Sequence, residues 1–339
     1  MSSQTPLPVA VVGAGALGAA AGLALARAGV EVVLVDEAPL AENASGIAAG
    51  MLAPAMESSL DPVSTGRFAL LSAARDLWPA FVEDLGPTGL ERCGALLRAA
   101  PAVIEKAMAR LGEQGARAQC VEPGALFTPE DWRIEPRLAL AAMLDGLRTR
   151  GGRLRRGRAR AVGPEGLELD DGEVIEARAT VLACGFGGQH LSPALSVLEP
   201  IKGQSLRYPD VEMSDGPILR GPGGYVVPSR DGPVCGATME PGVIGLAIDG
   251  DAVARLQAEA ARLAPQLAGA RPQARAGLRA TSPDGLPLVG LAEAGGPWLA
   301  AGARRDGWLL APMIAASLVR QIVHGGGPEA AFDPARFAR

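Results

Sequence analysis

The feature that most constrains this chain is a glycine pattern close to its start. Residues 9–12 are four consecutive apolar residues, typical of a buried strand, and Gly13, Gly15 and Gly18 follow with the spacing G-x-G-x-x-G. The Ala- and Leu-rich stretch after them predicts a helix that runs to about Ala28. A strand, a glycine turn and a helix in this order indicate the start of a Rossmann βαβ unit rather than a structural Ala/Gly-rich turn.

Each glycine has a separate function in such a unit. Gly13 allows the tight turn, Gly15 lets a pyrophosphate approach the backbone, and Gly18 lets the helix pack closely on the strand. The helix N-terminus offers N–H groups and a partial positive charge to the phosphates. A second strand, over 31–35, ends at Asp36, whose carboxylate can accept hydrogen bonds from ribose hydroxyls. The motif predicts a dinucleotide site but does not distinguish FAD from NAD.

Composition limits the class of protein. The 339 residues are enough for two domains and a large core. A hydrophobic content of 48% with 20% charged residues argues against disorder. The net charge is −5, and there is no basic stripe beyond residues 148–160, so we expect no nucleic-acid partner. We expect that arginine run to lie on a solvated face beside a strand.

Nothing in the chain predicts a membrane segment, a secretory signal or a metal site. Residues 1–8 lack the basic and apolar regions of a signal peptide, and the apolar run 308–323 is too short to cross a bilayer. The chain has two histidines, and its cysteines show no C-x-x-C spacing: Cys93, Cys120, Cys184 and Cys235. We therefore expect reduced cysteines in a cytoplasmic protein.

Residues 45–54 form a run of small and apolar residues that is too poor in polar turn formers for an ordinary surface loop. Small side chains over several positions suggest a backbone that lies against something large and flat. A tight helix–helix contact is the alternative.

The remaining periodicity separates two kinds of segment. Amphipathic patterns predict helices that begin at Asp61-Pro62 (with Phe68, Leu71, Trp78 and Phe81 on one side), and over 102–114, 137–149, 251–263 and up to about Val323. Short strands are predicted over 158–162, 166–169, 174–177 and 298–301, and the buried strand 179–185 returns to the nucleotide sheet. The runs 201–204, 224–228 and 234–239, separated by turn residues, indicate antiparallel strands.

These patterns predict an interleaved layout. The nucleotide domain comprises residues 1–84, 137–203 and 276–339, and a second, mainly antiparallel β domain comprises 85–136 and 204–275. The fold class is therefore α/β.

Several blocks resemble a known family when taken in order. They are the opening glycine motif and residues 48–52, 200–204, 225–228, 236–239, 277–279, 284–287 and 301–307. Together they resemble the D-amino-acid oxidase class of FAD flavoproteins, and within it the glycine oxidases of thiamin biosynthesis. The resemblance covers nearly the whole chain.

This resemblance implies a Rossmann-type FAD-binding domain with an inserted substrate domain and a flavin at the domain interface. It implies oxidation of glycine, sarcosine or a small D-amino acid to an imine. Water hydrolyses the imine to glyoxylate or a keto acid and ammonia, and oxygen becomes hydrogen peroxide. We expect FAD to be held non-covalently, because residues 48–52 and 301–307 contain neither Cys nor His.

The resemblance also implies roles for individual residues. Arg279 matches an arginine that pairs with the substrate carboxylate, Tyr225 matches a tyrosine that hydrogen-bonds it, and Arg305 matches a second arginine. Met51 and Met239 match residues beside the flavin and substrate. The residues expected to bind the cofactor are Gly13, Ala14, Gly15, Ala16, Leu17, Gly18, Asp36, Glu37, Ala48, Ala49, Gly50, Met51, Cys184, Gly185, Gly302, Arg305, Asp306, Gly307 and Trp308.

Three positions depart from the family pattern. Ala303 stands where the family usually has His, Asp306 where it has Asn, and Ala280 where it has Pro. These departures leave both arginines in place and bear on substrate preference and pocket shape. Surface salt bridges for the arginines, and plain core roles for Tyr225 and the two methionines, are the alternatives.

Hydride transfer from the amino acid to flavin needs a fixed carboxylate and no protein base at the α-carbon. A chain with two histidines suits such chemistry. A final helix that starts near Gly307 is expected to direct its positive end at the reduced flavin.

Rival functions remain open at this point. Within the class they are oxidation of sarcosine, proline or larger D-amino acids, or electron delivery to a quinone instead of oxygen. Outside it they are a flavin-binding subunit without turnover and a nicotinamide-dependent reductase. The preferred amino acid and the oligomeric state are also open.

Overall fold

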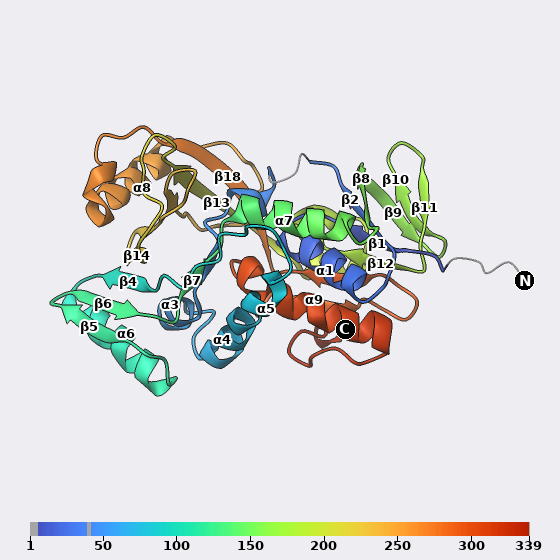
Figure 1. Ribbon diagram of the computed structural model, residues 1–339, viewed down its shortest axis with the longest axis horizontal. Coiled ribbons are helices and arrows are strands. Elements are labelled where there is room, and N and C mark those ends of the chain that lie inside the picture. The colour runs from blue at the N-terminus through green and yellow to red at the C-terminus, as the bar shows by residue number, and fades with distance from the viewer. Residues whose placement is uncertain (1–5, 39–41, 339) are drawn as a thin grey trace, which may run out of the picture. The chain divides into compact units, whose positions relative to one another are not determined.

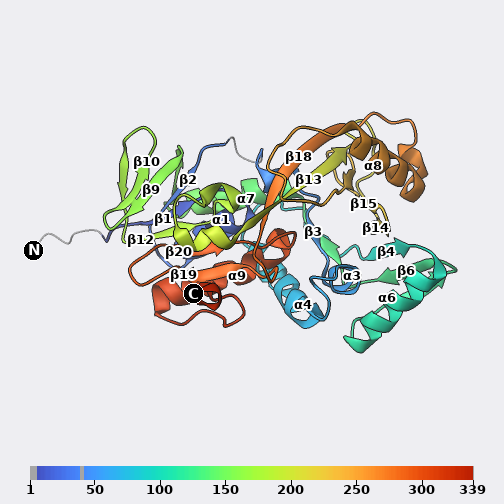
Figure 2. The same cartoon turned by 180° about the vertical axis from the view of Figure 1, so that it is seen from behind.

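The computed structural model describes residues 6–38 and 42–338. Residues 1–5, part of the segment in which we expect no secretory signal, lie outside this description. The chain divides into two compact units (Figures 1 and 2). Unit 1 consists of Met1–Gly46, Leu140–Pro200 and Arg279–Arg339, and unit 2 of Ile47–Ala139 and Ile201–Leu278.

Unit 1 contains most of the parallel strands. Its elements are β1 (Val9–Val12), α1 (Ala16–Arg27), β2 (Val32–Asp36), β8 (Arg153–Arg156), β9 (Ala159–Gly163), β10 (Gly166–Leu169), β11 (Val174–Glu176), β12 (Ala179–Leu182), η1 (Gly185–Gly188), η2 (Pro193–Val197), β19 (Leu288–Leu291), β20 (Trp298–Ala301), α9 (Gly307–His324) and η4 (Pro334–Phe337). Four elements span a boundary between units: α2 (Ala44–Ile47), α7 (Pro136–Arg148), β13 (Glu199–Arg207) and β18 (Gln273–Thr281).

Within the described residues, the main sheet of unit 1 has the strand order β19-β20-β12-β1-β2-β8. β1 pairs in parallel with β2 on one side and with β12 on the other, and all four residues of β1 are buried. The strand expected over 179–185 therefore does return to the nucleotide sheet. Of the described strands in this sheet, β19 alone runs antiparallel to its neighbour, β20.

Helices α1 and α9 pack against each other in unit 1 (Figure 1). Alanine and glycine form most of the buried surface of α1, which allows this close packing. A three-stranded antiparallel meander of β9, β10 and β11 shares a core with the main sheet, where Leu167 and Ile175 pack in the same cluster as Val33 and Val35.

Unit 2 is built on antiparallel strands with helices packed on them. Its elements are β3 (Met51–Leu52), α3 (Pro54–Leu60), α4 (Phe68–Asp76), α5 (Trp78–Val82), β4 (Ala95–Arg98), α6 (Pro101–Glu113), β5 (Gln119–Glu122), β6 (Ala125–Thr128), β7 (Trp132–Arg133), β14 (Ile218–Gly221), β15 (Gly224–Val227), β16 (Val234–Gly236), β17 (Glu240–Pro241), α8 (Gly250–Leu263) and η3 (Pro265–Leu267).

Among the described residues, the large sheet has the order β17-β13-β16-β15-β14-β4-β6-β5, and β18 pairs with β13. Along this order of described strands, neighbours are antiparallel except β14 with β4. Helix α6 buries Ile104 and Leu111 in one core cluster with Leu97 of β4. Helix α8 buries Leu256 and its neighbours in a second cluster with β15 and β16.

The single helix expected to begin at Asp61-Pro62 and to include Phe81 is wrong in detail. Asp61 ends α3 in an extended conformation, which the following Pro62 favours because it disfavours the helical region for the residue before it. The helix begins at Phe68 instead, and it stops at Asp76 before α5, whose first turn contains Pro79.

The domain boundaries also differ from those expected. The first lies at residues 46/47 instead of 84/85, because β3 pairs with β7 and α3 packs on α4 and α6 within unit 2. The other boundaries, at 139/140, 200/201 and 278/279, each lie three residues from the expected positions. The assignment of one unit to FAD and the other to substrate stays a prediction.

No helix in the described ranges is both long enough and apolar enough to span a membrane. Five of the seven arginines in the run 148–160 form ion pairs with nearby carboxylates: Arg148 with Asp145, Arg153 with Glu31, Arg155 with Asp171 and Glu173, Arg158 with Glu37 and Asp170, and Arg160 with Glu168. These pairs neutralise the positive charge of this surface locally.

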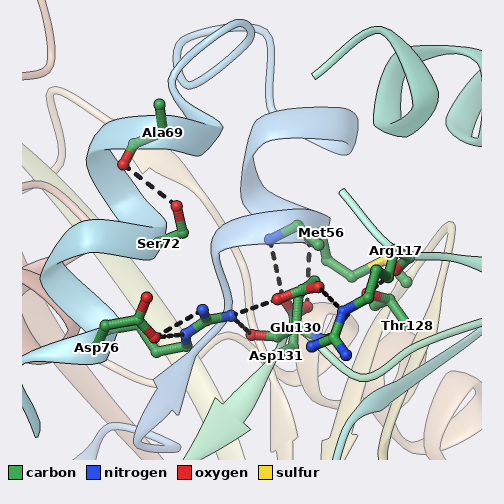
Figure 3. Close-up of polar contacts among 10 residues, drawn as sticks. Met56, Ala69, Ser72, Asp76, Arg117, Thr128, Glu130 and Asp131 are labelled. Carbon is green, nitrogen blue, oxygen red and sulfur yellow. Dashed lines mark hydrogen bonds and ion pairs between the residues drawn. The ribbon is translucent and has the colours of Figure 1, made fainter. Parts of the chain in front are cut away.

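A buried carboxyl group supports α3 from outside the helix. Asp131 is fully buried and accepts hydrogen bonds from the backbone N–H groups of Ala55, at 2.8 Å, and Met56, at 3.2 Å (Figure 3). It therefore satisfies two N–H groups in the first turn of α3, where no side-chain cap is present. Burial raises the pKa of Asp131 from 3.8 to about 7, although the Arg220 charge and the two N–H groups act to lower it.

Asp131→Asn is expected to change how stability depends on pH. Because the folded pKa of Asp131 exceeds the unfolded value, the folded protein binds more protons between pH 4 and 7, so its stability falls as pH rises through this range. The slope from this one group approaches ~1.4 kcal/mol per pH unit. Urea unfolding of wild type and variant at fixed FAD concentration should show that the variant lacks this slope.

Asp145→Asn, which removes an exposed carboxylate from α7, is the matched control and should leave the slope unchanged. Equal pH dependence in wild type and Asp131→Asn would contradict a raised pKa at Asp131.

Candidate functional site

The expected cofactor residues of unit 1 gather at one edge of its main sheet. Strands β1, β2, β12 and β20 are parallel, so their carboxyl ends lie at the same edge. Gly13, Asp36, Cys184 and Gly302 stand at or just after these four ends. Ligands of open α/β sheets bind in the crevice outside such an edge. The structure thus brings together four expected residues that are far apart in the sequence.

The glycine loop has no room for side chains at two of its positions. A Cβ atom on Gly13, whose φ is +102°, would lie 2.4 Å from the carbonyl oxygen of Ala183, and one on Gly18 would lie 1.8 Å from that of Gly13. Gly15 is the N-cap residue of α1. The loop is therefore held tightly between β1, α1 and the end of β12, as the motif predicts.

Polar groups line this loop from two sides. Asp36 accepts a hydrogen bond from the Ala14 N–H at 2.5 Å, and Ser45 Oγ accepts one from the Ala16 N–H at 3.0 Å. In the described structure, Gly15 provides no side-chain cap and the first turn of α1 contains no acidic residue. Such a helix end attracts a diphosphate, and an acid beside the loop suits a ribose, so these residues fit the adenosine diphosphate half of FAD.

Cys184 lies in the same region, but its thiol is unreactive. Burial raises the pKa of its thiol to about 11, and the nearby Asp36 charge acts in the same direction. The thiol is therefore protonated near neutral pH, whereas reaction with an electrophile requires the thiolate.

Two expected substrate residues come from neighbouring segments of unit 1. A β-bridge joins Thr281 to Ala303, and the Arg304 N–H donates to the Ala280 carbonyl at 2.9 Å. These contacts place the end of β18, which carries Arg279, beside the turn that carries Arg305. Ala280 and Ala303, where the family usually has larger residues, are both buried at this contact.

The turn after β20 leads directly into α9. Arg304 has a positive φ of 51°, Asp306 is the N-cap residue, and α9 begins at Gly307, as expected. Trp308 Nε1 donates to the Ser45 carbonyl at 3.1 Å. Ser45 thus contacts both the start of α1 and the start of α9, and it was missed in the sequence-based site. The signal was available in the small-residue run that begins with it.

The block 284–287 has a structural explanation. Asp284 accepts hydrogen bonds from Ser282 Oγ, the Leu286 N–H and the Arg336 guanidinium. Burial acts to raise the pKa of Asp284, but the donors outweigh it and hold the pKa at about 2. This carboxylate is therefore ionised at neutral pH and holds the turn between β18 and β19.

Unit 2 contains the remaining expected residues: Ala48, Ala49, Gly50, Met51, Tyr225 and Met239. Met51 lies in β3, opposite Arg133 of β7, and Gly50 has a positive φ of 73° beside the Ile134 carbonyl. Tyr225 is buried in β15 and lies opposite Gly236 of β16. A Cβ atom on Gly236 would approach the Tyr225 hydroxyl oxygen to 2.5 Å, so the glycine makes room for the phenol.

The segment that carries Met239 is fixed by a polar network. Thr238 Oγ1 accepts from the Gln204 N–H at 2.8 Å and donates to Glu240 at 2.6 Å. Gln204 and Lys202, both buried, also bind the Glu240 carboxylate, at 2.7 and 3.2 Å. Residues 202–204 and 238–240, which overlap two blocks of the resemblance, thus hold each other within unit 2.

Arg220 and Glu57 are charged residues of unit 2 that the sequence-based site did not contain. The Arg220 guanidinium binds Glu57 Oε1 at 3.1 Å and Met51 Sδ at 3.2 Å. Both side chains are at least 93% buried. No local pattern could have revealed this pair, because its partners lie 163 residues apart.

Comparison with known proteins places these observations in context. Residues 8–321 match the family model described as FAD dependent oxidoreductase. The chain is 31% identical to a glycine oxidase from Pseudomonas aeruginosa over 97% of the chain and 98% of that relative. The crystal structure of a glycine oxidase from Geobacillus kaustophilus superposes with a TM-score of 0.82 at 26% identity, with 98% of each chain covered.

Another group of relatives is longer. The tRNA 5-methylaminomethyl-2-thiouridine biosynthesis bifunctional protein MnmC from Caulobacter vibrioides is 32% identical over 96% of this chain. The chain spans 56% of that relative and 59% of a second one from Caulobacter sp.. The superposition on a glycine oxidase structure and the family match confirm the expected α/β fold, and the strand pairing of unit 2 is mainly antiparallel, as expected.

Asp36→Ala is expected to weaken FAD binding and leave the fold intact. A hydrogen bond to a charged group contributes about 1.5–3 kcal/mol, which corresponds to roughly 10- to 150-fold in the dissociation constant. FAD titration into apoprotein, followed by flavin fluorescence, measures the change.

Glu31→Ala is the matched control, since it removes a carboxylate and an ion pair with Arg153 just before the other end of the same strand. An Asp36→Ala dissociation constant equal to that of the control would show that Asp36 does not face the ribose.

Proposed function

We propose that this chain, which belongs to the FAD-dependent oxidoreductase family, oxidises glycine or another small amino acid. The family match confirms the resemblance noted from its sequence blocks. The first product is an imine. Water hydrolyses it to ammonia and either glyoxylate or a keto acid. Molecular oxygen is the electron acceptor and becomes hydrogen peroxide. A role in thiamin biosynthesis and a cytoplasmic location stay predictions.

One observation carries this proposal. The chain is similar to glycine oxidases both in sequence, with 31% identity over 97% of this chain, and in fold, with a TM-score of 0.82. The arginine run 148–160 provides a second argument, because five of its seven arginines pair with carboxylates, which reduces the attraction of this surface for RNA phosphates. A free amino acid is therefore favoured over a tRNA-linked substrate.

In this proposal each residue has a limited task. Arg279 binds the substrate carboxylate through two parallel hydrogen bonds, and Tyr225 donates a further one to the same group. Arg305 adds positive charge, while Met51 and Met239 supply apolar walls. FAD, when bound, supplies the hydride acceptor. The substrate amine must be deprotonated, and no protein base is required at the α-carbon.

A substrate panel with peroxide detection tests the proposal. Glycine, sarcosine and small D-amino acids should produce peroxide, and L-amino acids should not. Anaerobic mixing of the enzyme with each amino acid then shows which step fails if no peroxide forms. Reduction of flavin without peroxide formation in air indicates a different electron acceptor, such as a quinone. If no amino acid of the panel bleaches the flavin anaerobically, the proposed substrate class is wrong.

We predict that FAD is held without a covalent bond. The residues expected beside the ring offer no Cys or His, and the Cys184 thiol, with its pKa raised by burial to about 11, is protonated. Acid precipitation should therefore release all flavin absorbance into the supernatant. Yellow colour retained in the washed pellet would contradict this prediction.

Arg279→Ala is expected to impair catalysis strongly. Arg279 is half-buried in β18, and a bound substrate would desolvate it further. Loss of one partner of such a desolvated charge pair corresponds to about 2–5 kcal/mol, so kcat/KM for glycine should fall roughly 30-fold to several thousand-fold. Arg279→Lys should restore only part of the loss, because an ammonium cannot reproduce the two-pronged geometry. Steady-state peroxide assays with flavin content determined in parallel provide the measurement.

Arg275→Ala is the matched control, since Arg275 lies on the same strand, β18, and is exposed. The loss in Arg279→Ala should be much smaller for an amine that lacks a carboxylate. Equal losses for glycine and this amine, or loss of flavin, would assign Arg279 to the fold or the cofactor instead.

A further inference from the structure

In unit 2, Arg220 and Glu57 form a buried ion pair next to two of the proposed substrate residues, Met51 and Tyr225. Arg220 lies in β14, and its two terminal nitrogens bind different elements: one contacts Met51 Sδ of β3 at 3.2 Å and the other Glu57 Oε1 of α3 at 3.1 Å. The guanidinium carbon also lies 5.8 Å from the centre of the Tyr225 ring. Figure 2 shows β3, α3 and β14 in the same part of this unit.

Strand register explains why Arg220 reaches Tyr225. The two residues are directly opposite each other in the antiparallel pair β14–β15, so their side chains lie on the same face of the sheet. On its other side the phenol packs against Gly236, where a Cβ atom would come within 2.5 Å of the hydroxyl oxygen. Tyr225 is therefore held between a guanidinium on one strand and a glycine on the other.

Stability alone does not explain a charge at this position. Replacing a buried ion pair with apolar residues of similar size is often neutral or stabilising, whereas removing one partner is strongly destabilising. Buried ionic groups are therefore better explained where they impose a specific arrangement. A guanidinium suits this task, because its planar fork fixes the directions of several N–H groups at once.

We propose that Arg220 is a positioning residue: its guanidinium, anchored by Glu57, fixes Met51 and Tyr225 relative to each other and thereby sets the geometry that they present to the substrate. The inference rests on the proposed function, in which both residues contact the amino acid. Arg220 itself does not touch the substrate. Its loss therefore acts through Tyr225 and Met51.

The experiment uses the full chain loaded with FAD and labelled with 3-fluorotyrosine. The chain has only two tyrosines, so its ¹⁹F spectrum contains one resonance for Tyr208 and one for Tyr225, which the Tyr225→Phe variant assigns. The test variant is the double substitution Arg220→Met with Glu57→Gln, because it removes both partners of the ion pair together, so that neither is left buried without the other. Arg220 also acts on the buried Asp131, and its loss favours the protonated form of that carboxyl. Arg220→Lys is the conservative variant, which retains the charge without the fork.

In the double variant we expect the Tyr225 resonance to shift or broaden and the Tyr208 resonance to stay in place. KM for glycine should rise about tenfold, which corresponds to ~1.4 kcal/mol, with little change in kcat, because Tyr225 contacts the carboxylate in both ground and transition states. The rise in KM should be smaller in Arg220→Lys than in the double variant. If the double variant fails to retain FAD, Arg220→Lys carries the test through the same two measurements.

The matched control is Arg98→Met with Glu122→Gln, an exposed Arg–Glu pair of the same sheet. It should change neither the resonance nor KM. If the Tyr225 resonance or KM is unchanged in the double variant, the proposal is overturned. If only Arg220→Lys folds, the same two results in that variant overturn it. Absence of turnover in wild type would instead refute the proposed function, while the ¹⁹F spectra still decide whether Arg220 fixes Tyr225.

Discussion

The parallel pairing of β1 with β2 on one side and β12 on the other is the constraint on which unit 1 depends. Parallel strands align their carboxyl ends, so Gly13, Asp36 and Cys184 meet although long segments separate them in the chain. The glycines then let α1 start so close to the sheet that a single Cβ atom at Gly13 or Gly18 would overlap a backbone carbonyl. The polar edge that suits a dinucleotide is a consequence of this geometry.

Features with a local cause could be predicted from the sequence. The first strand, the glycine turn, α1 and Asp36 follow from a pattern within 28 residues, and β12 was recognisable as a buried strand that ends in glycine. The antiparallel runs of unit 2 were readable from their turn residues. The break between α4 and α5 was predictable in principle from Pro79, but the shared apolar face of Phe68 and Phe81 concealed it.

Features that depend on distant contacts could not be predicted. Whether residues 47–84 belong to one unit or the other is decided by the pairing of Met51 with Arg133 and by the packing of α3, neither of which has a local signal. Asp131 has no local signal in the sequence, yet it is fully buried and bonds the start of α3. The role of Arg220 likewise emerges only when Glu57, Met51 and Tyr225 are brought around it.

The packing of α1 on α9 has a consequence for biosynthesis. Residues 16–27 bury much of their surface against residues 307–324, and the Ser45 carbonyl accepts a hydrogen bond from Trp308 of the same later helix. During translation the glycine loop therefore emerges from the ribosome long before its supporting helix. Contacts of such long sequence separation form late and slow the folding of the domain. The nucleotide edge is consequently completed after translation has passed α9, and the early β1–α1 segment must stay soluble until then.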